Sequence, residues 1–140
     1  MKRISIIPIF LVLIGCSTPI AIETVVIKDC YDGDTCTTIT GEKIRLACID
    51  TPELRGKKAD PIPATAAKAY LNELVAGKEV FINRITKDRY QRTVAELSID
   101  GMNIQEHLVE YGFANVYERY ASQCKWTKKL VRLSGNNSLV

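Results

Sequence analysis

The chain has 140 residues, of which 25% are charged, and its formal net charge is +3. This length allows one domain with its own hydrophobic core but leaves little room for two. The small charge excludes overall basicity as an argument for nucleic-acid binding, so any such attraction must come from local clusters.

The first 15 residues have the layout of an export signal. Lys2 and Arg3 precede an apolar run at 4–14, which is shorter than the roughly 20 residues of a membrane-spanning helix. Residues 13–16 (Leu-Ile-Gly-Cys) resemble a bacterial lipobox, which predicts cleavage before Cys16 and lipidation of this cysteine; an ordinary signal peptide is the alternative. We therefore expect an exported, membrane-anchored cell-envelope lipoprotein, or otherwise a secreted or periplasmic protein. Loss of Lys2 and Arg3 would lower the net charge from +3 to +1.

Four further cysteines remain after such a cleavage: Cys30, Cys36, Cys48 and Cys124. An even number of cysteines in an exported protein predicts two disulfides, for which three pairings are possible. A zinc site is the rival interpretation, but the chain has no C-x-x-C pair. Its single histidine, His107, falls in an expected helix and is predicted to face solvent. We expect disulfides and leave their pairing open.

Hydrophobic patterning and turn residues predict the elements of one domain at 23–133, preceded by a tether at 16–22 and followed by a polar tail at 134–140. Strands are expected at 23–28, 35–39, 43–49, 79–85 and 93–99. A basic, proline-containing loop at 54–63 should precede a helix at 64–75, with Gly77 as its C-cap. Asn103 should cap a second helix that stops at Gly112, and 125–133 can form only about two and a half turns of a third. Three strands, a helix, two strands and a helix indicate an α+β protein: an OB-fold, the five-stranded Greek-key β-barrel, with two to three helices.

Two acidic clusters lie at the ends of neighbouring predicted strands, at 31–35 (Tyr-Asp-Gly-Asp-Thr) and 45–53 (Arg-Leu-Ala-Cys-Ile-Asp-Thr-Pro-Glu). Carboxylates from two adjacent strand ends can converge on one cation, and oxygen ligands are what calcium or magnesium requires. Each cluster also has a simpler interpretation, because Asp, Gly and Pro are favoured in tight turns. Together with Arg45 as an anion clamp and Glu53 as a base, the two clusters favour metal-assisted attack on a phosphodiester.

The order D-G-D-T, then R-L-x-x-I-D-T-P-E, then D-x-Y-x-R resembles the staphylococcal nuclease (thermonuclease) family. The likeness runs from residue 25 to about 116, which is nearly all of the predicted barrel and its two helices. It implies an OB-fold endonuclease that uses Ca²⁺ to hydrolyse DNA and RNA with low sequence specificity, leaving 3′-phosphate ends.

The resemblance also implies residue roles, carried over by position. The calcium would be bound by the carboxylates of Asp34 and Asp50 and by the main-chain carbonyl of Thr51. Glu53 would be the general base that activates the attacking water. Arg45 and Arg92 would bind the phosphate and stabilise the transition state, which suits the planar fork of a guanidinium.

Three tyrosines are candidates for substrate binding. Tyr90, two residues before Arg92, resembles the family's nucleotide-contacting tyrosine, and Tyr117 and Tyr120 fall where the family has further aromatic residues. Aromatic rings can stack on any base, which favours single-stranded or frayed DNA and RNA. Packing of Tyr90 on the barrel rim is the alternative. The sequence suggests no protein partner, and we expect a monomer.

Two other classes of function remain as rivals. A non-catalytic OB-fold module that binds nucleic acid would keep the barrel without the chemistry, although every matched site residue is present. A structural envelope lipoprotein could use the acidic turn to bind calcium for stability alone, but this would leave Arg45 and Arg92 without a role.

Overall fold

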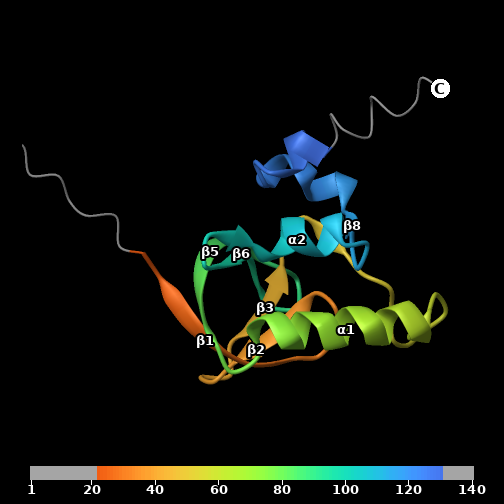
Figure 1. Ribbon diagram of the computed structural model, residues 1–140, viewed down its shortest axis with the longest axis horizontal. Helices are drawn as coiled ribbons and strands as arrows, with labels where there is room; N and C mark the ends of the chain where they lie inside the picture. Colours follow the sequence, from red (N-terminus) through yellow and green to blue (C-terminus); the bar gives the residue numbers. More distant parts are fainter. Residues whose placement is uncertain (1–21, 131–140) are drawn as a thin grey trace, which may run out of the picture.

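The five longest strands close into a β-barrel in the computed structural model, which describes residues 22–130 (Figure 1). These strands are β1 (Thr24–Cys30), β2 (Thr35–Thr38), β3 (Lys43–Leu46), β5 (Glu79–Lys87) and β6 (Thr93–Ile99). They pair in the order β3-β2-β1-β5-β6, each antiparallel to its neighbours, and a parallel pairing of β3 with β6 closes the ring. Closure removes the free edges of an open sheet and confirms the expected OB-fold barrel.

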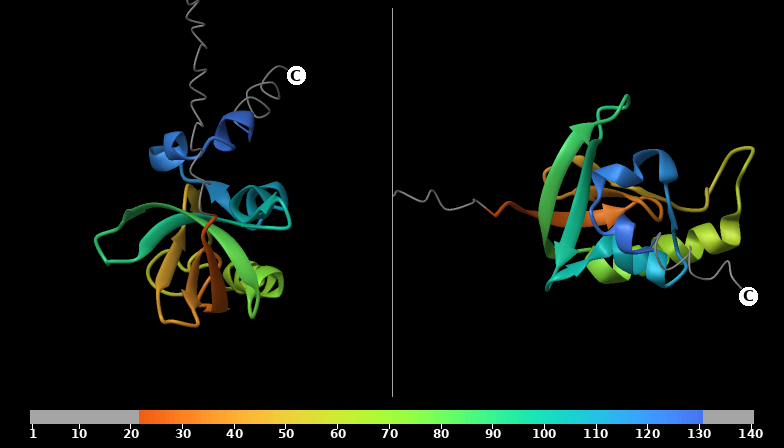
Figure 2. Two further views of the ribbon diagram at one scale, coloured as in Figure 1. Left: turned by 90° about the vertical axis from the view of Figure 1, so that its left-hand side faces the viewer. Right: turned by 90° about the horizontal axis from the view of Figure 1, so that it is seen from above.

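Smaller elements complete the fold, and Figure 2 shows how they surround the barrel. They are the two-residue strands β4 (Ile49–Asp50), β7 (Met102–Asn103) and β8 (Asn115–Val116), the helices α1 (Pro61–Val75) and α2 (Ile104–Glu110), and the 3-10 helix η1 (Glu118–Gln123). The β5–β6 hairpin extends beyond the barrel body, so its tip at 88–92 projects to one side (Figure 2).

The barrel interior is filled by aliphatic side chains from alternating strand positions. Ile27, Ile44 and Leu97 are fully buried there, and α1 and α2 each add a buried leucine, Leu71 and Leu108. Each such burial contributes about 1.5–3 kcal/mol to folding. The same alternation that turns Ile44 inward places the next residue of β3, Arg45, on the outside. Core packing therefore sets the direction of one predicted site residue.

Helix α1 begins at Pro61, three residues before the expected start at Ala64. Proline is tolerated in the first helical turn because the N–H that it lacks would have no helical partner there. At the other end, Ala76 is the C-cap, and Gly77 follows it with a φ of +74°. The N–H of Gly77 donates to the Ile27 carbonyl at 2.8 Å, so this glycine turns the chain back to β1 instead of capping the helix itself.

Helix α2 confirms the predicted cap and stop but corrects the placement of His107. The Asn103 side chain accepts the Glu106 N–H at 3.0 Å, and Gly112 ends the segment with a φ of +78°. His107 is half-buried, because Tyr70 of α1 lies against it with the hydroxyl 2.8 Å from Nε2. A contact between two helices is not encoded in the pattern of either one.

The expected strand at 43–49 is broken after Leu46, which is the main correction to the predicted elements. Cys48 has a φ of +64°, a left-handed conformation that cannot continue a strand. The chain then resumes as β4, which pairs with β8 so that Asp50 lies opposite Asn115. The C-terminal segment also differs from expectation: η1 was not predicted, and the last described helical turn covers 127–130, starting later than residue 125.

Both expected disulfides form, and the structure decides their pairing. Cys30 is bonded to Cys36 and Cys48 to Cys124. The predicted signal peptide, Cys16, the polar tail and the end of the third helix lie outside residues 22–130. Within 22–130, none of the helices has the length and apolar character needed to cross a membrane.

Candidate active site

The acidic turn at 31–35 is fixed by packing as well as by its own hydrogen bonds. The Cys30–Cys36 disulfide closes its base, and the Asp34 N–H donates to Oδ1 of Asp32 at 3.0 Å. A Cβ on Gly33 would lie 2.8 Å from Cβ of Ala67 and 2.9 Å from Cγ2 of Thr51. Glycine is needed here because the turn touches α1 and Thr51, a constraint that an isolated hairpin would not have.

Asp34 is the buried centre of the site, with a residue exposure of only 7%. Its Oδ2 accepts hydrogen bonds from the Thr51 hydroxyl at 2.9 Å and the Thr51 N–H at 3.3 Å. The Thr35 hydroxyl donates to its Oδ1 at 3.1 Å. Burial raises the pKa of Asp34 to about 6, although Arg45 lowers it. A second cation beside this buried carboxylate would stabilise its charged form.

Arg45 links the two predicted calcium carboxylates. Its Nη2 lies 3.2 Å from Oδ2 of Asp34 and 3.5 Å from Oδ1 of Asp50. The guanidinium also donates to the carbonyls of Leu46, at 2.8 Å, and Ile49, at 2.9 Å, which flank the turn that joins β3 to β4. A guanidinium has five N–H donors, and in the described structure its Nε makes no hydrogen bond, so Arg45 is held firmly and still has a donor for an anion.

The predicted metal ligands fit an open, hard-cation site. Asp34 and Asp50 contact one guanidinium nitrogen, so their carboxylates converge, and Thr51 follows Asp50 directly. Within residues 22–130, no three His, Cys, Asp or Glu side chains gather closely enough to hold a metal by themselves. A cation here would need the Thr51 carbonyl and water as further ligands, which calcium accepts readily.

Glu53 is exposed and lies three residues after Asp50, beyond the end of β4. Its carbonyl accepts the Asp60 N–H at 2.9 Å, which ties together the two ends of the loop before α1. No ion pair engages its carboxylate in the described part of the chain. The structure therefore leaves this carboxylate exposed and gives it no hydrogen bond or ion pair with Asp34, Asp50 or Arg45 among the described residues.

Arg92 reaches the same cluster from a different hairpin. Its Nε donates to Oδ2 of Asp88 at 2.7 Å, and its Nη1 donates to the Thr35 hydroxyl at 3.3 Å. Because that hydroxyl also donates to Asp34, Thr35 connects Arg92 to the buried carboxylate. The two predicted phosphate-binding arginines are thus coupled to different oxygens of Asp34, Arg45 directly to Oδ2 and Arg92 through Thr35 to Oδ1.

Asp88 and Thr35 belong to the sequence motifs, but neither residue was predicted to have a role in the site. Asp88 receives the Arg92 Nε and also the main-chain N–H groups of Tyr90 and Arg92, at 2.9 and 3.0 Å. These hydrogen bonds lower its pKa, against the opposing effect of burial. The spacing D-x-x-x-R in the hairpin was the available signal, since an Asp can accept N–H groups two and four residues further on.

The three candidate tyrosines do not lie in one place. Tyr90 is at the tip of the β5–β6 hairpin, with its ring centroid 5.5 Å from the Arg92 guanidinium carbon. Tyr117 follows β8, and its N–H donates to the Cys48 carbonyl at 2.8 Å. Tyr120 packs edge-to-face on Tyr117, with centroids 5.1 Å apart. The β4–β8 pairing therefore brings the Tyr117–Tyr120 pair beside the segment of Asp50, whereas Tyr90 accompanies Arg92.

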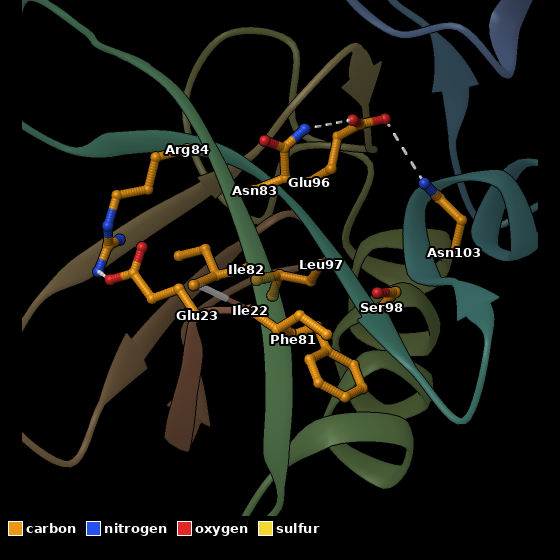
Figure 3. A pocket seen from close by; sticks show the side chains of 10 residues that line it. All are labelled: Ile22, Glu23, Phe81, Ile82, Asn83, Arg84, Glu96, Leu97, Ser98 and Asn103. Atoms are coloured by element: carbon orange, nitrogen blue, oxygen red, sulfur yellow. Dashed lines mark hydrogen bonds and ion pairs between the residues drawn. The ribbon is translucent and has the colours of Figure 1, made fainter. Parts of the chain in front are cut away.

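A depression of about 520 Å³ lies elsewhere, between residues 22–23 and the β5–β6 hairpin (Figure 3). Its polar side chains satisfy one another: Arg84 pairs with Glu23 at 3.0 Å, and Glu96 accepts from Asn83 at 3.1 Å. It contains none of the predicted site residues. The candidate active site is therefore placed at the convergence of Asp34, Arg45 and Arg92 and not in this depression.

Comparison with known proteins shows the family of the chain. Residues 43–136 match the family model for the staphylococcal nuclease homologue. The chain belongs to this family. Over 121 residues it is 37% identical to an uncharacterized endonuclease of Haemophilus influenzae, a match that covers 84% of the chain and 64% of that protein.

Two other relatives, which are also named as nucleases, match shorter parts of the chain. An uncharacterized endonuclease of Escherichia coli O157:H7 is 39% identical over 93 residues, which cover 64% of the chain and 58% of that protein. A probable staphylococcal-like nuclease of Oryza sativa subsp. japonica is 33% identical over 90 residues, covering 62% of the chain and 26% of the rice protein. The chain spans less than two thirds of the length of each of these three relatives.

Proposed function

We propose that this protein is a calcium-dependent endonuclease, a phosphodiesterase that hydrolyses DNA and RNA with low sequence specificity. The observation that carries the proposal is that both arginines are coupled to the buried Asp34, Arg45 directly at Oδ2 and Arg92 through the Thr35 hydroxyl at Oδ1. A nucleic-acid-binding module needs positive charge, but it does not need two guanidinium groups coupled to a buried carboxylate. The relatives called endonucleases support the same reaction class.

In the proposed reaction, Glu53 takes a proton from the water that attacks phosphorus. The bond from phosphorus to the 5′ oxygen breaks, which leaves a 3′-phosphate and a 5′-hydroxyl end. General-base assistance of this kind contributes about 10²–10⁴-fold to the rate. The position of Glu53, exposed and free of ion pairs in the described structure, supports this role.

Arg45 and Arg92 stabilise the negative charge that gathers on the phosphoryl oxygens in the transition state. Because both groups are fixed before substrate arrives, little reorganisation is needed during the reaction. Arg45 is fixed by the carbonyls of Leu46 and Ile49, and Arg92 by Asp88. Asp34, Asp50 and the Thr51 carbonyl would hold calcium, which when bound would supply Lewis-acid polarisation of the phosphate.

Single-stranded or frayed DNA and RNA are the proposed substrates, with Tyr90, Tyr117 and Tyr120 contacting bases. All three tyrosines are at least 40% exposed, so their side chains are accessible to a substrate, and aromatic rings can stack on any base. The cellular setting is a further proposal from the sequence: export by the segment 1–15, cleavage before Cys16, and a lipid anchor that holds a monomeric domain near a membrane.

The direct test is a nuclease assay on the purified protein with calcium, with magnesium and with excess chelator. We expect cleavage of single-stranded DNA and RNA with calcium, weak cleavage with magnesium, and none with chelator. Full activity in chelator would contradict the calcium roles of Asp34 and Asp50. Retained oligonucleotide binding without cleavage under any of these conditions would favour the non-catalytic binding module.

A further inference from the structure

The Cys48–Cys124 disulfide joins two segments that flank the proposed active site. Cys48 lies in the turn between β3 and β4, two residues before Asp50, and Cys124 directly follows η1. The same turn holds Arg45 through the carbonyls on either side of Cys48 and Ala47. One end of this crosslink is therefore attached to the backbone that supports the arginine and the metal carboxylate.

The other end anchors a segment that has few contacts with the barrel. No residue of η1 is buried. Before η1, the segment is attached through the two-residue β4–β8 pairing and the hydrogen bond from the Tyr117 N–H to the Cys48 carbonyl at 2.8 Å. Figure 1 shows this segment (blue) beyond β8, outside the barrel. Beyond Cys124 the chain is attached again, through Trp126 on the main core and through the ion pair of Lys129 with Glu106 at 3.2 Å, so Tyr117 and Tyr120 lie between two sets of attachments.

Cys48 and Cys124 belong to a small apolar cluster beside the main core, and Ala47 is its third buried member. Ile85 of β5 and Val94 of β6 pack against this cluster, and Trp126 packs against both the cluster and the main core. The buried members of the main core are other residues, contributed by the barrel strands and both helices. Loss of the disulfide should therefore release the C-terminal segment locally while the barrel stays folded.

We propose that the Cys48–Cys124 disulfide positions the Tyr117–Tyr120 pair for substrate binding. The inference rests on the proposed function and adds a positioning role to two residues that touch no substrate. The rings meet edge-to-face with centroids 5.1 Å apart, and each residue is 40% exposed, so the pair presents an ordered, open aromatic surface. A surface ordered in advance loses less entropy when a base binds to it.

The test compares E53Q with the C48A/C124A/E53Q variant, in which a labelled single-stranded oligonucleotide is cut slowly enough for its binding to be measured. We expect the Kd to rise about tenfold, the order of loss for one stacked base. In the variants that retain Glu53, KM for the same oligonucleotide should rise while kcat changes by less than about twofold. Trp126, the chain's single tryptophan, reports the local release through its fluorescence.

C30A/C36A is the matched control, because it removes the other disulfide, which lies within the main core and closes the acidic turn at 31–35. We expect it to change Trp126 fluorescence less than C48A/C124A does, and to weaken oligonucleotide binding less. A double-mutant cycle with Y117A/Y120A adds a second measurement. If the disulfide acts through the tyrosines, the combined variant should bind no more weakly than either pair alone.

Unchanged oligonucleotide affinity in C48A/C124A that retains its cooperative melting transition would overturn the proposal. An equal loss in C30A/C36A would also overturn it, since the effect would then be general loosening. If C48A/C124A does not fold, Y117A/Y120A with both disulfides intact decides, and undiminished binding by that variant rules the role out. Absence of cleavage by the wild-type protein contradicts the nuclease function instead, because the binding assay needs no cleavage.

Discussion

Asp88 holds Arg92 twice, through Nε at 2.7 Å and through the main-chain N–H at 3.0 Å. The pair belongs to the tip of the β5–β6 hairpin, which extends beyond the barrel and has no core of its own to fix it. The Asp88 carboxylate therefore fixes the position of Arg92, whereas packing fixes other residues of the site. It orients the guanidinium toward the Thr35 hydroxyl and so toward Asp34.

The D88N variant should lower kcat without removing activity. An amide can still accept the main-chain N–H groups but attracts the Arg92 guanidinium less, so the arginine should be less well aligned; we expect a loss of about tenfold, within the range for a charge-assisted hydrogen bond. Steady-state kinetics with single-stranded DNA give kcat and KM. A loss as large as that of R92A would show that Asp88 takes part more directly than by positioning.

The pKa of Asp88 is lowered in the folded protein, because hydrogen bonds from Arg92 and Tyr90 outweigh the effect of burial. Its contribution to stability is therefore present above the ordinary Asp pKa and is lost as pH falls through the folded value. The wild-type protein should lose more stability than D88N on acidification, as measured by urea unfolding.

The E53Q variant should bind substrate almost as well as the wild-type protein but cleave it much more slowly. Glutamine is nearly isosteric with glutamate and cannot accept the proton, so we expect kcat to fall by about 10²–10⁴-fold with little change in oligonucleotide Kd. Glu73, on α1 and away from the acidic clusters, provides a control in E73Q, which should be fully active. Wild-type rates in E53Q would remove Glu53 from the mechanism.

The R92K variant tests whether charge alone is sufficient. A lysine keeps the positive charge but cannot contact Asp88, Thr35 and a phosphate at once, because it lacks the planar fork. We expect R92K to lose nearly as much kcat as R92A, by about 10²-fold or more, in line with loss of a preorganised donor. R89K in the same hairpin is the matched control, and its activity should be near that of wild type. Full activity in R92K would mean that only charge matters there.

Asp34 makes the metal-free protein less stable at neutral pH than in acid. Its pKa is raised from 3.8 to about 6 by burial, so folding favours the protonated form. The stabilisation that this proton brings is complete below the unfolded pKa and is lost as pH rises through the folded value. In chelator, the stability of D34N relative to wild type should therefore rise by about 2–3 kcal/mol between pH 4 and 7.

At pH 7, excess calcium should stabilise the wild-type protein more than it stabilises D34N. A ligand that binds only the folded state stabilises it by mass action, and D34N loses a calcium carboxylate. Thermal melts of both proteins with chelator and with excess calcium provide the comparison. If calcium raises both melting temperatures equally, Asp34 is not a ligand.

The C16S variant tests the proposed lipid anchor. Lipidation requires the cysteine thiol, so C16S should yield little acylated and processed protein, whereas the wild type should incorporate a fatty-acid analogue and fractionate with membranes. S17A is a neighbouring control that keeps the thiol. A wild-type protein that is entirely soluble and unlabelled would refute the anchor and leave the nuclease proposal untouched.

Much of the fold was accessible from the sequence, because local rules and core patterning agree with the final structure. The Asn103 cap and the five alternating strands are examples of local propensity and burial pointing the same way. The break after Leu46 was missed, because the left-handed Cys48 sits inside an apolar run that reads as one continuous strand. The half-buried His107 was missed because its partner Tyr70 lies 37 residues away on another helix.

The sequence by itself determined which residues are candidates for the site, since the spacing of its acidic, arginine and tyrosine motifs is a property of the chain. Only the tertiary structure decided how they are joined: Thr35 between Arg92 and Asp34, Arg45 between two carboxylates, and Gly33 pressed against α1. It also chose one of three disulfide pairings. The physical reason is that these relations depend on distances between segments far apart in the chain, which are set when the barrel closes and its core packs.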